Sequence, residues 1–130
     1  EKEGKKVAKF LFPKAGNRLG FEYGSQYEVS QFDFKPGEQI LLYTDGIIEG
    51  ENRKKALYGQ KKFKQSLEKH MGESPEDLMT KVVGDAFMFF DGTPPNDDIS
   101  LLLVRFLTAE ENNSKDNEGN DRLDVMDGIL

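Results

Sequence analysis

The stretch that decides the fold is Gly37-Glu38-Gln39-Ile40-Leu41-Leu42-Tyr43-Thr44-Asp45-Gly46-Ile47-Ile48-Glu49. Its apolar run, residues 40–43, is typical of a buried strand. The run ends at Asp45-Gly46, a pair that favours a sharp turn because glycine adopts a positive φ without strain. The sequence therefore predicts a carboxylate held at the end of a rigid strand.

A second acidic segment lies far along the chain. Asn96-Asp97-Asp98 runs directly into the apolar stretch 99–104, so these carboxylates precede a strand. If the two strands are antiparallel neighbours, Asp45 and Asp97 meet at one edge of the sheet. Converging carboxylates repel each other unless a cation lies between them, and such hard oxygen ligands suit Mg²⁺ or Mn²⁺.

Two further strands are predicted before these segments, and the last strand can be given its full range. Residues 7–12 form an apolar run that ends at Pro13, and residues 27–34 alternate between apolar and polar side chains. The turn sequence 35–38 contains Pro and Gly in the usual order, so it is expected to join 27–34 to 40–43 as an antiparallel hairpin. The last strand, residues 99–106, is apolar for most of its length and is expected to be central.

Two helices are expected between the acidic segments, after an exposed loop over 49–55. The first covers residues 60–71, and Gly72 is expected to cap it. The second begins with Ser74 as N-cap and Pro75 at the first helical position. Its apolar residues recur every 3.6 positions, from Leu78 through residues 82 and 86 to the Phe87–Phe90 cluster, which is expected to be core.

The composition excludes several classes. The 130 residues suffice for one domain with a modest core. A net charge of −6 gives no electrostatic support for nucleic-acid binding, and the chain has no cysteine for disulfides or thiolate zinc sites. No apolar run approaches the roughly 20 residues that cross a bilayer, so we expect no membrane insertion and a cytoplasmic location.

The composition changes after residue 108. Residues 109–130 hold seven acidic and two basic side chains, so they carry most of the net charge. We interpret 1–108 as the folded domain and 109–130 as an acidic tail, disordered over 109–120. The apolar residues within 123–130 suggest a short docking segment.

The two acidic motifs together carry a resemblance. Tyr43-Thr44-Asp45-Gly46, followed by two helices and then Asp97-Asp98-Ile99-Ser100, resembles the SpoIIE-like (stage II sporulation protein E) branch of the metal-dependent, type 2C (PPM) serine/threonine protein phosphatases. The resemblance covers roughly residues 7–107 in order, and either motif alone would be weak. Glu38 stands where the family usually has Asp, and Ser100 where it usually has Thr.

The resemblance implies both a fold and a chemistry. The fold is α+β, part of a four-layer αββα sandwich with antiparallel sheets. Family members bind two Mn²⁺ or Mg²⁺ ions, which activate a water for attack on phosphoserine or phosphothreonine. Asp45 and Asp97 match metal ligands of the family, and Asp98 matches a neighbour that supports or ligates.

The resemblance also implies an earlier half of the domain with further metal-binding acids. Before Tyr27 the acids are Glu1, Glu3 and Glu22, and none ends an apolar strand beside a glycine. The chain thus resembles the C-terminal half of a phosphatase domain, and we expect it to be inactive alone. A sheet edge left open where strands are missing is expected to form a homodimer.

The sequence is compatible with two function classes. The first is a phosphatase of bacterial regulatory signalling that acts on a phosphorylated protein, such as an anti-sigma-factor antagonist, and so regulates a sigma factor. The second is a non-catalytic protein-interaction module from a degenerate or split phosphatase domain. His70 offers no support to either, because a histidine near a helix C-terminus is expected to favour the helix dipole.

Overall fold

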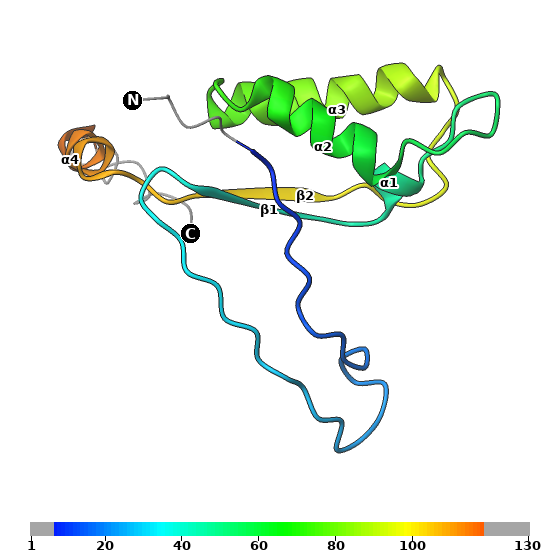
Figure 1. Cartoon of the computed structure of the whole chain (residues 1–130), viewed down its shortest axis with the longest axis horizontal. Coiled ribbons are helices and arrows are strands. Elements are labelled where there is room, and N and C mark those ends of the chain that lie inside the picture. Colours follow the sequence, from blue (N-terminus) through cyan, green and yellow to red (C-terminus); the bar gives the residue numbers. More distant parts are fainter. Residues whose placement is uncertain (1–6, 119–130) are drawn as a thin grey trace, which may run out of the picture. The chain divides into compact units, whose positions relative to one another are not determined.

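A computed structural model describes residues 7–118 of the chain. Within this range the elements follow in the order β1 (Gln39–Tyr43), α1 (Gly46–Glu49), α2 (Gly59–His70), α3 (Pro75–Phe90), β2 (Leu101–Arg105) and α4 (Ala109–Glu118) (Figure 1). β1 and β2 pair as an antiparallel two-stranded sheet. The α+β class is therefore confirmed, as is the antiparallel pairing of the two strands that flank the acidic segments. The four-layer arrangement stays a prediction.

The described residues divide into two compact units. The first contains residues 7–33 and 43–101, and the second contains residues 34–42 and 102–118. Helices α1 to α3 and both acidic segments belong to the first unit, whereas most of β1 and β2 and all of α4 belong to the second. None of the described helices is long and apolar enough to span a membrane.

The core of the first unit lies between α2 and α3, which run side by side (Figure 1). The predicted stripe of α3 is buried at Leu78, Val82, Ala86 and Phe90. Its partners from the other elements are Ile47, Tyr58 and Phe63. Burial of such side chains contributes about 1.5–3 kcal/mol each, so this cluster stabilises the unit. The expected Phe87–Phe90 core is correct only in part, because Phe87 is 49% exposed.

The helix boundaries follow the sequence closely, with one correction. Ser74 caps α3 by accepting a hydrogen bond from the backbone N–H of Asp77 at 3.1 Å, and Asp91 ends the helix in the left-handed conformation. Gly72, however, does not adopt the left-handed cap expected at the end of α2. The backbone N–H of Glu73 instead bonds to the carbonyl oxygen of His70 at 3.1 Å, which closes the turn without a positive φ.

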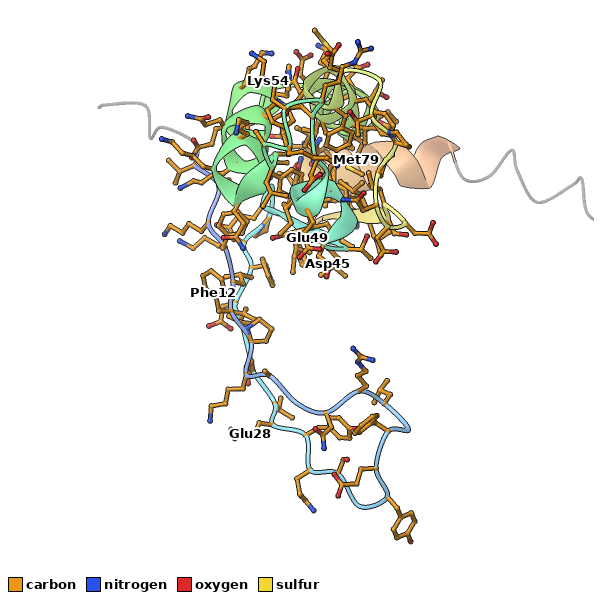
Figure 2. All side chains as sticks on the ribbon, turned by 90° about the vertical axis from the view of Figure 1, so that its right-hand side faces the viewer. Phe12, Glu28, Asp45, Glu49, Lys54 and Met79 are labelled. Atoms are coloured by element: carbon orange, nitrogen blue, oxygen red, sulfur yellow. The ribbon has the colours of Figure 1, made fainter. Side chains whose placement is uncertain are left out.

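The strands expected over 7–12 and 27–34 are wrong. Residues 7–38 contain no strand and follow an extended path, on which Phe12 and Glu28 lie (Figure 2). Just beyond the first stretch, the Lys14 backbone N–H donates a bond to Ser30 Oγ, in the second stretch, at 3.2 Å. Alternation favours an extended backbone, but a strand also needs a hydrogen-bonded neighbour, and neither stretch has one among the described residues.

The hairpin prediction fails for the same reason, although its turn is correct. The Glu38 backbone N–H bonds to the Lys35 carbonyl oxygen at 3.0 Å, and Gly37 has φ +86°. A positive φ at this third position, after Pro36, is the type II geometry. β1 then pairs with β2 and not with residues 27–34. As one of two strands, β2 is an edge strand within the described sheet, and not the central strand expected.

The disordered linker expected over 109–120 is wrong for residues 109–118, which form α4. The sequence signal was a capping box, in which Thr108 and Glu111 bond reciprocally. Glu111 Oε2 accepts from the Thr108 backbone N–H at 3.0 Å, and Thr108 Oγ1 accepts from the Glu111 backbone N–H at 3.4 Å. Residues 119–130, with the expected docking segment, lie outside the described residues. The domain boundary at 108 stays a prediction.

Candidate metal-binding edge

Asp45 lies between β1 and α1 and serves as the N-cap residue of that short helix. Its carbonyl oxygen accepts bonds from the backbone N–H groups of Ile48 and Glu49, both at 2.9 Å. Its side chain makes no capping bond and is exposed. The backbone of Asp45 is therefore held by α1, while its carboxylate stays available to a ligand.

Asp97 and Asp98 lie in the loop that leads from α3 to β2. One carboxylate oxygen of Asp97, Oδ1, accepts a hydrogen bond from the backbone N–H of Asp98 at 2.7 Å. This bond fixes the orientation of the Asp97 carboxylate relative to its own backbone. The second oxygen, Oδ2, makes no hydrogen bond or ion pair within residues 7–118, so it can accept a bond from a ligand or bind a cation.

The structure brings the backbones of the two acidic segments into contact. Gly46 packs against the second segment so closely that an added Cβ would lie 2.5 Å from the Asp98 carbonyl oxygen and 3.1 Å from that of Asp97. Thr44 Oγ1 donates to the same Asp98 oxygen at 2.9 Å. Residues separated by more than fifty positions thus form one edge of the first unit.

A pocket of about 240 Å³ opens at this edge, lined by Gly46, Glu49, Glu51, Leu57, Asn96 and Asp97. Two of its acids, Glu49 and Glu51, were not predicted as site residues. Glu49 follows Asp45 by four positions, one helical turn, and its backbone N–H bonds to the Asp45 carbonyl oxygen at 2.9 Å. That spacing was a usable signal. Glu51 gave no comparable signal, because a short bridge between Glu51 and Leu57 places it there.

A second pocket, of about 510 Å³, adjoins the first. It is lined by Phe87, Pro95 and Ile99, together with Asn96, Asp97 and Asp98. Asn96 and Asp97 belong to both pockets. Asp97 therefore stands between an acidic pocket and a partly apolar one.

The oxygen donors at this edge fit Mg²⁺ or Mn²⁺ in kind, because both ions prefer carboxylates. Too few of these carboxylates lie close together to bind such an ion through protein ligands alone. Within residues 7–118, no three side chains of His, Cys, Asp or Glu lie close enough together to hold a metal. The described residues can therefore supply part of a metal site.

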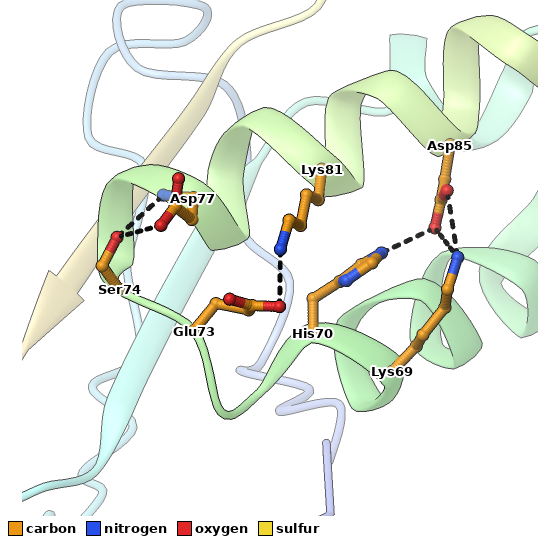
Figure 3. A network of polar contacts seen from close by, with 7 residues as sticks. All are labelled: Lys69, His70, Glu73, Ser74, Asp77, Lys81 and Asp85. Carbon is orange, nitrogen blue, oxygen red and sulfur yellow. Dashed lines mark hydrogen bonds and ion pairs between the residues drawn. The ribbon is translucent and has the colours of Figure 1, made fainter.

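His70 belongs to a separate polar cluster between α2 and α3. Its Nε2 lies 3.0 Å from Asp85 Oδ2, and the same oxygen accepts a bond from Ser66 Oγ at 2.7 Å (Figure 3 shows His70 and Asp85). The Ser66 bond, followed by His70 and Lys69, holds the pKa of the Asp85 carboxyl below its ordinary value. None of these residues lines either pocket, so the cluster joins two helices and does not extend the site.

Comparison with known proteins places these observations in a family. The family of stage II sporulation protein E (SpoIIE) matches residues 3–107, a range that includes both acidic segments. Protein IcfG of Synechocystis sp. (strain ATCC 27184 / PCC 6803 / Kazusa) is 22% identical over 96 residues. These cover 74% of this chain and 15% of IcfG, so the chain spans a small part of that relative's length. No solved structure matches the chain.

Proposed function

This chain belongs to the stage II sporulation protein E family, and from that premise we propose that it is part of a metal-dependent serine/threonine phosphoprotein phosphatase. The observation that carries the proposal is the contact between the two acidic segments. Gly46, next to Asp45, lies against the carbonyl oxygens of Asp97 and Asp98. An arrangement that gathers exposed carboxylates at one pocketed edge suits a cation, whereas it would disfavour a phosphate on its own.

Mn²⁺ or Mg²⁺ is the proposed cofactor, and Asp45 and Asp97 are its proposed ligands from this chain. Asp98 is proposed to support Asp97 through its backbone N–H, which holds one Asp97 oxygen at 2.7 Å. When bound, such ions lower the pKa of a coordinated water and stabilise charge on a transferring phosphoryl group. The remaining ligands are proposed to come from outside the described residues, which lack a complete set.

The proposed substrate is a phosphorylated regulatory protein, such as an anti-sigma-factor antagonist of bacterial signalling, in the cytoplasm. Support for this class comes from family membership. The isolated chain is proposed to form a homodimer, because apolar side chains such as Phe12 and Val29 are 76% and 93% exposed on the extended segment. Elution as a monomer at high concentration would contradict the dimer.

The test compares this 130-residue chain with the whole protein that contains it, using Mn²⁺ and p-nitrophenyl phosphate, then a phosphoserine peptide. We expect metal-dependent hydrolysis by the whole protein and none by the chain. Asp45→Asn and Asp97→Asn should each lower kcat/KM by about 100-fold or more, since loss of a mere supporting partner already costs about 10–100-fold. Asp33→Asn, an exposed acid outside both pockets, is the matched control. Full activity of either site variant contradicts the assignment.

The alternative is a non-catalytic protein-interaction module. Its support is the incomplete set of acids within residues 7–118. The same experiment separates the two functions. If the whole protein neither binds Mn²⁺ nor hydrolyses phosphate esters, Asp45 and Asp97 have no metal to hold and the module is favoured.

A further inference from the structure

We infer that Thr44 is a positioning residue, whose hydroxyl sets where the Asp97-Asp98 segment lies relative to Asp45. The inference rests on the proposed function, because it concerns the same edge. It assigns Thr44 no contact with substrate or metal. Its role follows from the hydrogen bonds that connect the end of one strand to the approach of the other.

At Thr44, directly after β1, one of the two backbone hydrogen bonds expected between paired strands is replaced by a bond to a side chain. Its backbone N–H bonds to the Ser100 carbonyl oxygen at 3.0 Å, as expected of an antiparallel ladder. The reciprocal donor, the Ser100 backbone N–H, bonds instead to Thr44 Oγ1 at 2.9 Å. A side-chain oxygen thus occupies the place where a ladder normally uses a backbone carbonyl.

The same hydroxyl also acts as a donor. Thr44 Oγ1 donates its proton to the carbonyl oxygen of Asp98 at 2.9 Å. A hydroxyl has one proton to donate and accepts through its lone pairs. The Thr44 hydroxyl therefore donates to Asp98 and accepts from Ser100 at the same time. It holds residues 98 and 100 at a fixed separation, immediately before Asp45.

This connection reaches the Asp97 carboxylate in two steps. Thr44 fixes the carbonyl group of Asp98, and the backbone N–H of Asp98 bonds to Asp97 Oδ1 at 2.7 Å. Gly46 restricts the same carbonyl group, because an added Cβ would lie 2.5 Å from the Asp98 carbonyl oxygen. Displacement of the Asp98 backbone would therefore change the position of the Asp97 carboxylate relative to Asp45.

Because Thr44 is exposed, its effect on the position of the acidic residues can be separated from an effect on the stability of the fold. Thr44 lies at the surface, so water can replace both bonds when the hydroxyl is removed. Stability should then change little, while the separation of the acids is no longer fixed. Thr44→Val keeps the side-chain shape and removes the hydroxyl, whereas Thr44→Ser keeps the hydroxyl. Thr80→Val is the matched control, because Thr80 Oγ1 bonds within α3, to the Glu76 carbonyl oxygen at 2.9 Å.

The experiment measures three quantities on these variants of the whole protein: the midpoint of urea unfolding, the Mn²⁺ affinity by calorimetry, and kcat for a phosphoserine peptide. We expect Thr44→Val to lower Mn²⁺ affinity and kcat about 10–100-fold, the effect typical of a residue that orients a metal ligand. Its unfolding midpoint should match that of Thr80→Val. Thr44→Ser should stay within about threefold of the wild type on all three.

The outcomes separate this inference from the proposed function. Wild-type activity and Mn²⁺ affinity in Thr44→Val overturn the positioning role alone. A loss in Thr44→Val that Thr44→Ser does not restore also overturns it, because the hydroxyl would then not be the group responsible. A wild-type protein that neither binds Mn²⁺ nor turns over overturns the proposed function and this inference with it. Faster amide exchange of Ser100 in Thr44→Val, with the serine variant unchanged, supports the hydroxyl bridge independently of activity.

Discussion

Gly46 lies against the carbonyl oxygen of Asp98, at a distance that leaves no room for a Cβ atom. A Cβ placed on Gly46 would be 2.5 Å from that oxygen. Both groups belong to the backbone, so neither can move aside as a flexible side chain would. The contact joins the first residue of α1 to the loop before β2, and it depends on the amino acid at a single position.

Gly46→Ala should therefore destabilise the chain. Overpacking of this kind typically costs about 1–3 kcal/mol, because the backbone must shift to relieve it. Urea unfolding of the chain, followed by circular dichroism, measures the change in the free energy of unfolding. Gly72→Ala is the control, because no atom lies within 4 Å of its added Cβ. Equal unfolding midpoints for the two variants would contradict the contact.

Gly50 provides a second close approach, in this case to a buried ring. A Cβ on Gly50 would lie 2.3 Å from two ring carbons of Phe90, which is 1% exposed. Gly50→Ala should lower the free energy of unfolding by about 1–3 kcal/mol, since Phe90 cannot leave the core.

Gly84→Ala is predicted to have the opposite effect. Gly84 lies inside α3, and among the described residues no side chain and no atom of another element is within 4 Å of its added Cβ. Alanine in a helix interior is favoured over glycine by about 0.5–1 kcal/mol, so thermal unfolding of Gly84→Ala should shift upward. A lower unfolding temperature would mean that another group packs at this face.

The Asp85 cluster predicts a loss of stability in acid. The folded pKa of Asp85 is lower than its unfolded pKa, chiefly because Ser66 Oγ donates to the carboxylate. Such a group stabilises the fold at pH values above the unfolded pKa. The stabilisation is complete near pH 6 and is lost as the pH falls below about 4, through the folded pKa.

Unfolding measured from pH 6 to pH 3 checks this sign. Asp85→Asn should be less stable at pH 6 by about 1–3 kcal/mol, because Ser66 and His70 lose a charged partner. The difference between the variant and the wild type should shrink toward pH 3. A difference that stays constant with pH would contradict a titrating Asp85.

The cap of α3 predicts a smaller and more local effect. Ser74 accepts from the Asp77 backbone N–H at 3.1 Å and bonds to the Asp77 carboxylate at 3.0 Å (Figure 3). Ser74→Ala should cost about 1 kcal/mol, and Ser74→Asn should restore most of it, since asparagine is an equally good N-cap residue and adds no charge beside the Asp77 carboxylate. Thermal unfolding measures both, and an unchanged Ser74→Ala would show that the cap is dispensable.

The sequence was sufficient wherever one segment determines its own structure. The boundaries of α3 follow from Ser74, Pro75 and the break at Asp91, all of which act within one or two turns. The turn at residues 35–38 follows from Pro36 and Gly37 for the same reason. These predictions needed no knowledge of distant parts of the chain.

The sequence was insufficient wherever a structure depends on a partner. Residues 7–12 and 27–34 have strand-like alternation, but alternation does not supply the neighbouring strand that would hydrogen-bond to them. At the candidate site, the motifs predicted that the segments of Asp45 and Asp97 meet at one edge, and the structure brings them into contact, while their role as ligands stays a prediction. Glu51 was not predicted there, because its place follows from a bridge to Leu57. The error over α4 was different, because the Thr108 and Glu111 capping box was present but was outweighed by the acidic composition of the tail.

The central claim is that Asp45 and Asp97 serve one metal centre. Calorimetric titration of the whole protein with Mn²⁺ tests it most directly, using Asp45→Asn, Asp97→Asn and the double variant. The account predicts that each single variant lowers Mn²⁺ affinity about 10-fold or more, and that the double variant loses less than the product of the two effects, because coupled residues are not additive. Wild-type affinity in either single variant, or two effects that simply multiply, would contradict a shared centre.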